Sequence, residues 1–158
     1  MANKNVNLRP AAKKDMPAIY RMGFDVWGEL SSMSAYLDAC ENSEKYKLGK
    51  WFCLEDNKLL LSSLIIYRDC LGLDKGYCGL GSIATVPELR KNGFATRLIE
   101  QCIESLRQEG VTGVYLFSDI TPSFYEKLGF IGVQGHTEQG LMYLGISGEG
   151  GREVPSYF

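Results

Sequence analysis

The chain has 158 residues, of which 45% are hydrophobic and 23% charged, and its formal net charge is −2 at pH 7. This length suits one domain with a buried core, so we predict that residues 1–158 form a single domain. The slightly negative charge excludes nucleic-acid binding through a general basic field. No stretch approaches the roughly 20 apolar residues of a membrane-spanning helix, and the N-terminus has no apolar signal core. We therefore expect a cytoplasmic protein with no membrane partner.

The residues that ordinarily bind metals are few and scattered. The chain has a single histidine, His136, and its cysteines form no Cys-x-x-Cys pair. The cysteines are Cys40, Cys53, Cys70, Cys78 and Cys102. This pattern is typical of free core thiols in a reducing compartment, and we predict no bound metal.

The first half of the chain predicts helices followed by a β-hairpin. Asp15 before Pro17 is typical of a helix start, and Asp56-Asn57-Lys58 separates two runs rich in strand-forming residues. In chain order the predicted elements are a strand over Val6–Arg9, a helix from Asp15 to about Leu30, a short helix from a cap at Ser34 to about Cys40, and strands over Trp51–Glu55 and Leu59–Arg68.

The second half contains the clearest helix of the sequence, in which apolar residues recur at three- and four-residue spacing from Ala95 to Leu106. Pro87 ends the strand before this helix, and Gly110 ends the helix itself. The elements predicted around it are strands over Tyr77–Val86, Gly113–Ser118, Phe130–Gln134 and Leu141–Ile146 and a short helix over Thr121–Leu128. We expect the glycine-rich tail from Ser147 to be mobile. This order predicts a mixed α/β sheet with helices on both faces.

The segment Pro87–Thr96 has the features of an anion-binding loop. The start of a helix presents unpaired backbone N–H groups at the positive end of the helix dipole, where a phosphate is stabilised. Gly93 permits a ligand to approach the backbone closely, and Arg90 and Lys91 add positive charge. The segment predicts a site for a phosphorylated cofactor; the alternative is a glycine that serves only as a turn.

The strand before this loop carries an unusual number of small residues. They are Gly79, Gly81, Ser82, Ala84 and Thr85. Small side chains let an extended ligand lie against a strand and bond its backbone. Close packing of a helix is the alternative explanation for one or two of the glycines.

Two motifs follow one another in the second half of the chain. They are Pro87-x-x-Arg90-x-x-Gly93-x-Ala95 and Phe124-Tyr125-Glu126-Lys127-Leu128-Gly129-Phe130. The pair resembles the GNAT superfamily of acetyl-CoA-dependent N-acetyltransferases, and the resemblance covers the order of elements from the first strand to the last. It implies acetyl-CoA as the cofactor. The implied fold is α/β, with a mixed, mostly antiparallel central sheet of about six to seven strands, splayed between strands 4 and 5, and helices on both faces.

The resemblance also implies a role for each matching position. Ile83, Ala84 and Thr85 match the strand whose backbone contacts the pantetheine arm, and Lys91–Thr96 match the loop whose amides hold the pyrophosphate. The complete set expected to bind the cofactor is Ile83, Ala84, Thr85, Arg90, Lys91, Asn92, Gly93, Phe94, Ala95, Thr96 and Ser118.

Tyr125 matches the tyrosine that protonates the departing thiolate of coenzyme A in many members of the superfamily. The role suits a phenol, because its pKa of about 10 is roughly matched to that of an alkyl thiol. The alternative is a tyrosine that only packs by its ring.

The base that takes the proton of the acceptor amine does not follow from the motifs. Many members use a glutamate on the strand before the phosphate loop, but Tyr77–Val86 contains no acidic residue. The candidates are Asp25, Glu29, Asp69, Asp74, Asp119 and His136, or a chain of water molecules. The aromatic residues expected near the acceptor, which suit a cationic or partly apolar amine, are Phe24, Trp27, Trp51, Tyr67, Tyr143 and Tyr157.

We therefore predict an N-acetyltransferase that moves the acetyl group of acetyl-CoA directly to a primary amine in a ternary complex. The alternative is an acyl-CoA-binding sensor or interaction domain of the same fold, which the missing strand glutamate favours and Tyr125 disfavours. A nucleotide-phosphate-binding domain has no supporting motif. The sequence leaves open whether the acceptor is a small molecule or a peptide, whether another acyl group is used, and whether the chain forms a homodimer.

Overall fold

The computed structural model describes residues 5–28, 30–150 and 154–158. Contacts within the chain divide it into two compact units. The first unit contains the chain up to Ile65 together with Ser82–Ile99, and the second contains Ile66–Gly81 together with Glu100–Phe158. Among the described residues, no helix combines the length and the apolar run needed to cross a bilayer.

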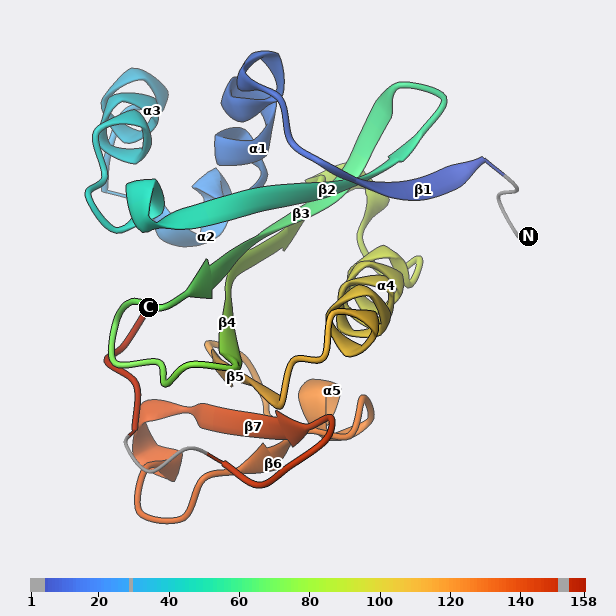
Figure 1. Cartoon of the computed structure of the whole chain (residues 1–158). Coiled ribbons are helices and arrows are strands. Elements are labelled where there is room, and N and C mark those ends of the chain that lie inside the picture. Colours follow the sequence, from blue (N-terminus) through green and yellow to red (C-terminus); the bar gives the residue numbers. More distant parts are fainter. Residues whose placement is uncertain (1–4, 29, 151–153) are drawn as a thin grey trace. The chain divides into compact units, whose positions relative to one another are not determined.

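The strands form a seven-stranded sheet with the order β1-β2-β3-β4-β5-β7-β6 (Figure 1). Strands β4 and β5 are parallel, whereas the pairs β1–β2, β5–β7 and β6–β7 are antiparallel. The strands are β1 Val6–Pro10, β2 Gly49–Asp56, β3 Leu59–Arg68, β4 Tyr77–Thr85, β5 Gly113–Phe117, β6 Ile131–Gly132 and β7 Leu141–Gly145. The predicted mixed sheet is confirmed.

The helices follow the predicted order, with short 3-10 turns between them. The α-helices are α1 Met16–Met22, α2 Phe24–Trp27, α3 Met33–Glu41, α4 Phe94–Gln108 and α5 Ser123–Glu126. The 3-10 turns are η1 Lys13–Asp15, η2 Tyr46–Leu48, η3 Pro87–Leu89 and η4 Thr137–Gln139. On α4 the predicted apolar face is buried at Leu98, Ile99, Cys102, Ile103 and Leu106.

The helix predicted from Asp15 to about Leu30 is wrong in its length, because Gly23 divides it into α1 and α2. A Cβ atom at position 23 would overlap the ring of Trp27, so this break needs glycine. The cap of the next helix is Ser32 and not Ser34. Its Oγ accepts a hydrogen bond from Ala35 N at 3.1 Å.

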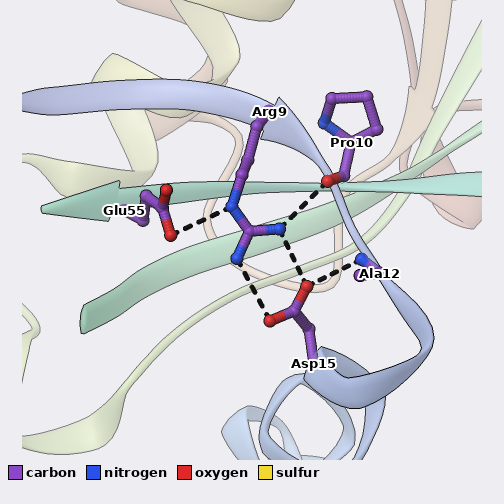
Figure 2. Close-up of polar contacts among 5 residues, drawn as sticks. All are labelled: Arg9, Pro10, Ala12, Asp15 and Glu55. Atoms are coloured by element: carbon purple, nitrogen blue, oxygen red, sulfur yellow. Dashed lines mark hydrogen bonds and ion pairs between the residues drawn. The ribbon is translucent and has the colours of Figure 1, made fainter. Parts of the chain in front are cut away.

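Arg9 on β1 ties the first strand to the turn before α1 (Figure 2). Its guanidinium donates to both carboxylate oxygens of Asp15, at 2.8 and 3.1 Å, and its Nε forms an ion pair with Glu55 at 2.9 Å. Asp15 Oδ2 also accepts from Ala12 N at 2.7 Å. Hydrogen bonds from Arg9 and Ala12 lower the pKa of the buried Asp15 carboxyl, against the opposing effect of its burial. This cluster fixes the start of the fold through charge-assisted hydrogen bonds.

In the second unit, the first residues of β4 pair with β5. Tyr77–Leu80 pair in parallel with Gly113–Leu116. The pairing with β5 therefore involves the first half of β4, whereas the later residues Ser82–Thr85 belong to the first unit.

The C-terminal tail, expected to be mobile from Ser147, has packed residues where the structure describes it. The Phe158 ring lies 5.2 Å from that of Tyr67 and 5.0 Å from that of Phe117, between centroids. A Cβ atom at Gly79 would overlap the Phe158 ring. Close packing is therefore the reason for glycine at position 79. Residues 151–153 lie outside the described part of the tail.

Two short elements of the second unit are shorter than predicted. The helix expected over Thr121–Leu128 spans only α5, and the strand expected over Phe130–Gln134 spans only β6. Pro122 precedes α5 with helical backbone angles but lacks an N–H group. After Gly132 the chain leaves the strand and enters a turn in which His136 N donates to Val133 O at 3.0 Å.

Candidate active site

The loop between β4 and α4 has a backbone suited to an anion. Lys91 and Gly93 both have positive φ, 67° and 80°. Arg97 N donates to Gly93 O at 3.0 Å and closes the first turn of α4. The N–H groups of Phe94–Thr96 precede that bond, so they have no acceptor within the helix and are directed beyond its N-terminus. The helix dipole adds positive potential at the same place.

The space beside Gly93 is open. A Cβ atom built at this position would meet no heavy atom within 4 Å, and the residue is exposed together with Lys91 and Asn92. Asn92 Nδ2 donates to Leu89 O at 2.9 Å and to Arg90 O at 3.2 Å, which closes the loop from inside. A ligand can therefore approach the backbone at Gly93 without displacing a side chain. The loop has the open backbone at a helix start that binding of an anion requires.

The Arg90 side chain, expected beside the phosphates, binds other parts of the first unit. Its guanidinium donates to both carboxylate oxygens of Asp25, at 2.6 and 2.9 Å, to Met22 O at 3.0 Å and to Thr85 O at 3.3 Å. Hydrogen bonds from Arg90 lower the pKa of Asp25. Arg90 thus joins the loop to α1 and α2, and Asp25, as a weak base in an ion pair, is poorly suited to accept a proton.

The last residues of β4, expected to line the pantetheine arm, are held by β3. Ser62 Oγ donates to Ala84 O at 2.7 Å and lies 3.1 Å from Thr85 Oγ1. Thr85 is buried, whereas Ile83 and Ala84 are half-buried. Ser82 before them has φ of 46°, which interrupts the regular strand, and its Oγ lies 3.0 Å from the hydroxyl of Tyr46.

Tyr125 lies on α5 in the second unit and is buried. Its ring packs edge-on against Phe124 and Phe130, with centroids 5.0 and 6.1 Å away. Burial raises the pKa of Tyr125 to about 12, and the negative charge of Asp119 adds to the increase. The phenol therefore keeps its proton at all ordinary pH values.

The residues directly after β5 form a local turn. Ser118 Oγ donates to Ile120 O at 2.6 Å, so its hydroxyl proton is used within this turn. Asp119 accepts a hydrogen bond from the hydroxyl of Tyr157 at 3.1 Å. Asp119 thus binds the C-terminal segment through Tyr157, and its negative charge also helps to raise the pKa of Tyr125.

The second unit also contains a cavity of about 560 Å³. Its walls come from the end of β5, the turn containing η4 and the C-terminal segment, at Phe117, His136, Gln139, Val154, Pro155, Ser156 and Tyr157. The rings of Phe117 and Tyr157 meet edge-on with centroids 4.9 Å apart. His136 and Tyr157 were candidates from the sequence. The other lining residues carry no motif from which the cavity could have been predicted.

The remaining candidates are dispersed. Asp69 and Asp74 lie in the loop between β3 and β4, and Glu29 lies outside the described residues. The aromatic residues expected around an acceptor belong to separate clusters: Phe24 with Tyr36, Trp51 with Tyr20 and Tyr46, Tyr67 with Phe158, Tyr143 with Tyr77 and Tyr115, and Tyr157 with Phe117. Trp27 is 40% exposed.

The comparison with protein families agrees with the motifs. Residues 16–130 match the model of the acetyltransferase (GNAT) family. The chain belongs to this family, as predicted from the two motifs. None of the curated proteins compared with the chain matches it significantly.

Solved structures share the fold at low sequence identity. A GNAT family acetyltransferase from Brucella melitensis in complex with acetyl-CoA is 19% identical, with 97% of this chain and 93% of that chain covered and a TM-score of 0.67. The ribosomal-protein-S18-alanine N-acetyltransferase of Escherichia coli is 21% identical, with 97% and 99% covered and a TM-score of 0.65. The PaiA N-acetyltransferase of Thermoplasma acidophilum in complex with coenzyme A is 13% identical, with 92% and 99% covered and a TM-score of 0.69. The predicted fold is confirmed.

Proposed function

We propose that this protein is an N-acetyltransferase that moves the acetyl group of acetyl-CoA directly to a primary amine in a ternary complex. The observation that carries the proposal is the loop Lys91–Thr96, in which the start of α4 leaves N–H groups without an acceptor in the helix and the space beside Gly93 is open. Family membership supports the chemistry, and two of the similar structures hold acetyl-CoA or coenzyme A. When bound, acetyl-CoA supplies the activated acetyl thioester.

The cofactor would be held mainly by backbone groups of the first unit. The N–H groups of Phe94–Thr96 bind the pyrophosphate, and Lys91 adds an exposed positive charge. Ile83, near the end of β4, offers backbone groups to the pantetheine arm. Arg90 supports this arrangement from behind by fixing the loop to Asp25. Ser118 takes no direct part here, because its hydroxyl proton is used within its own turn.

Tyr125 supplies a proton at its hydroxyl oxygen. The buried phenol is protonated at neutral pH. Because its pKa of about 12 lies above that of an alkyl thiol, transfer of its proton to the leaving thiolate is uphill and is drawn forward when the phenol is protonated again. The attacking nitrogen is positively charged once it has bonded to the acetyl carbon, and the proton that it loses as the amide forms can restore the phenol. Water is the competing acceptor of the acetyl group. The rings of Phe124 and Phe130, which surround Tyr125, therefore also protect the thioester against hydrolysis.

An assay of acetyl-CoA with a panel of amines tests the proposal. The panel contains spermidine, free amino acids, peptides with a free N-terminus, a lysine peptide and phenethylamine, and the readouts are free thiol and the mass of the acetylated amine. We expect thiol release that depends on the amine, with the acetylated product in equal amount. Binding of acetyl-CoA with only slow hydrolysis across the panel would instead favour an acyl-CoA sensor.

A further inference from the structure

The cavity of the second unit contains the only histidine of the chain. His136 shares its walls with apolar groups of Phe117, Pro155 and Tyr157. Imidazole is the side chain that ordinarily exchanges a proton near neutral pH. A primary amine is an ammonium ion at neutral pH and must lose a proton before it can attack a carbonyl carbon. The cavity therefore combines space for a small molecule with a group able to take that proton.

A hydrogen bond defines which nitrogen of His136 can act. Its Nδ1 lies 3.3 Å from Oε1 of Gln139, and a carbonyl oxygen can only accept. Nδ1 therefore carries the hydrogen of the neutral ring, and Nε2 carries the lone pair. Gln139 thus sets the tautomer that a proton acceptor at Nε2 requires.

The backbone of this turn is fixed to the end of β5. Ser118 N donates to Gly140 O at 2.7 Å, and His136 O accepts from Gln139 N at 3.2 Å and from Leu141 N at 3.3 Å. Gly140 has φ of 78°, and a Cβ atom there would overlap the backbone of Ser118. The position of His136 relative to β5 is consequently determined by hydrogen bonds and close packing and not by an unsupported loop.

Tyr125 is influenced electrostatically by a residue that is bonded to the wall of the cavity. Tyr157 lines the cavity and donates to Asp119, and Asp119 is near enough to Tyr125 to influence its charge state. The other titratable side chains on the elements around the cavity are Tyr115 on β5, Asp119 after β5, Glu138 two residues after His136, and Tyr157 on the C-terminal segment. Among these types of side chain, imidazole is the one that ordinarily exchanges a proton near neutral pH.

From this arrangement we propose that the cavity binds the acceptor, a primary amine on an aromatic or aliphatic body, and that His136 Nε2 removes the proton from its ammonium group. The inference rests on the proposed N-acetyltransferase function. His136 takes one proton and becomes imidazolium, the amine keeps the electron pair of the broken N–H bond, and the imidazolium returns its proton to solvent. The apolar walls favour such an amine over a polyamine, whose further charges would lose their hydration there.

A binding experiment tests the acceptor site without any turnover. The protein has one histidine, so in a preparation without a histidine tag the imidazole resonances in an NMR spectrum belong to His136 alone. We expect phenethylamine to shift them in a saturable way and spermidine to leave them in place. Ser156→Trp, which fills the cavity, should abolish the shift. An unchanged resonance with phenethylamine would overturn the assignment of the cavity.

The pH dependence of kcat/KM with phenethylamine tests the proton transfer. His136→Gln should lower kcat/KM at pH 7 about 100-fold and replace the acidic decline set by the imidazole with one that follows the titration of the amine itself, at higher pH. Gln139→Glu should move that decline to higher pH, because a carboxylate beside the ring stabilises imidazolium. Glu138→Gln, on the same turn but outside the cavity, is the matched control and should leave the profile in place.

The outcomes separate the two proposals. If the wild-type protein acetylates no amine, the proposed function is wrong. If it acetylates phenethylamine but the pH profiles of His136→Gln and Gln139→Glu match that of the wild type, only the role of His136 is wrong. If it acetylates spermidine but not phenethylamine, the proposed class of acceptor is wrong.

Discussion

The β4–α4 loop of the first unit and the Tyr125–His136 region of the second differ in which groups are available to a ligand. In the loop, the side chains of Arg90 and Asn92 are bonded to the protein itself, and the backbone of the α4 start is left open. In the second unit the backbone is bonded within turns, and the groups that we propose as reactive are a phenol and an imidazole. In the proposed enzyme, cofactor binding therefore depends on main-chain shape, whereas the chemistry depends on two side chains.

The largest effect is expected from closing the open space of the loop. Gly93→Glu should weaken binding of coenzyme A by at least about 1000-fold, because a side chain and a negative charge would occupy the phosphate position. Gly110→Glu is the matched control, since Gly110 also has positive φ (83°) and nothing within 4 Å of a Cβ atom. Calorimetric titration measures both. Normal affinity in Gly93→Glu would contradict the phosphate-loop assignment.

Removal of the phenol should affect turnover and not cofactor binding. Tyr125→Phe should lower kcat about 100-fold or more while leaving the Kd of coenzyme A unchanged, because general acid catalysis is worth this much. Tyr143→Phe is the control, since burial also raises the pKa of Tyr143 to about 12. Steady-state kinetics and calorimetry provide the two readouts. A kcat equal to that of the wild type would show that Tyr125 only packs.

The pH dependence of kcat should also report whether Tyr125 acts as the general acid. A general acid must hold its proton, and a pKa raised to about 12 moves the loss of the Tyr125 proton above the usual range of a phenol. We therefore expect kcat not to decline between pH 8 and about pH 10.5 on account of this group. An alkaline decline of kcat that Tyr125→Phe removes, with its midpoint near pH 10, would indicate a phenol with an ordinary pKa.

A smaller effect on coenzyme A binding is expected from removing the ion pair between Arg90 and Asp25, which holds the loop in place. Asp25→Asn should weaken coenzyme A binding about fivefold, as expected for a partly exposed ion pair that positions a binding group. Arg90→Gln should have a similar effect, and the double variant should be no worse than either single one. If Arg90 contacted phosphate directly, Arg90→Gln would be much more harmful than Asp25→Asn. Calorimetry on the three variants distinguishes these cases.

The smallest functional effect is expected at the Arg9 cluster, which contributes only to the fold. Asp15→Asn should reduce the free energy of unfolding by about 2 kcal/mol, because Asp15 is buried and accepts bonds from both Arg9 and Ala12. This contribution is complete above the unfolded pKa of the carboxyl and is lost as the pH falls through its lowered folded value. Urea unfolding at pH 7 measures it. The Kd of coenzyme A should not change.

The features of the fold that the sequence predicted correctly are those specified by local patterns. The spacing of apolar residues along α4 defined its buried face, and the turn at Asn57 and Lys58, both with positive φ, ended β2 where predicted. The break at Gly23 and the packing of Phe158 on Gly79 were missed, because each depends on an aromatic ring that approaches a glycine in the folded chain.

The candidate site was predictable to a similar extent. The phosphate loop and Tyr125 lie within short motifs, so their positions followed from sequence. The partners of Arg90 did not, because Met22 and Asp25 are far away in the chain. The cavity around His136 could not be predicted either, because its walls come from three separate segments without a common motif.

Single-turnover mass spectrometry tests the central claim most directly. The protein is held in excess over acetyl-CoA, an amine that gave product in the panel is added, and both the amine and the intact protein are weighed after quenching. Direct transfer predicts that the acetyl group appears on the amine while the mass of the protein stays constant. An acetylated protein as the intermediate, or acetate in place of the acetylated amine, would contradict the proposed reaction.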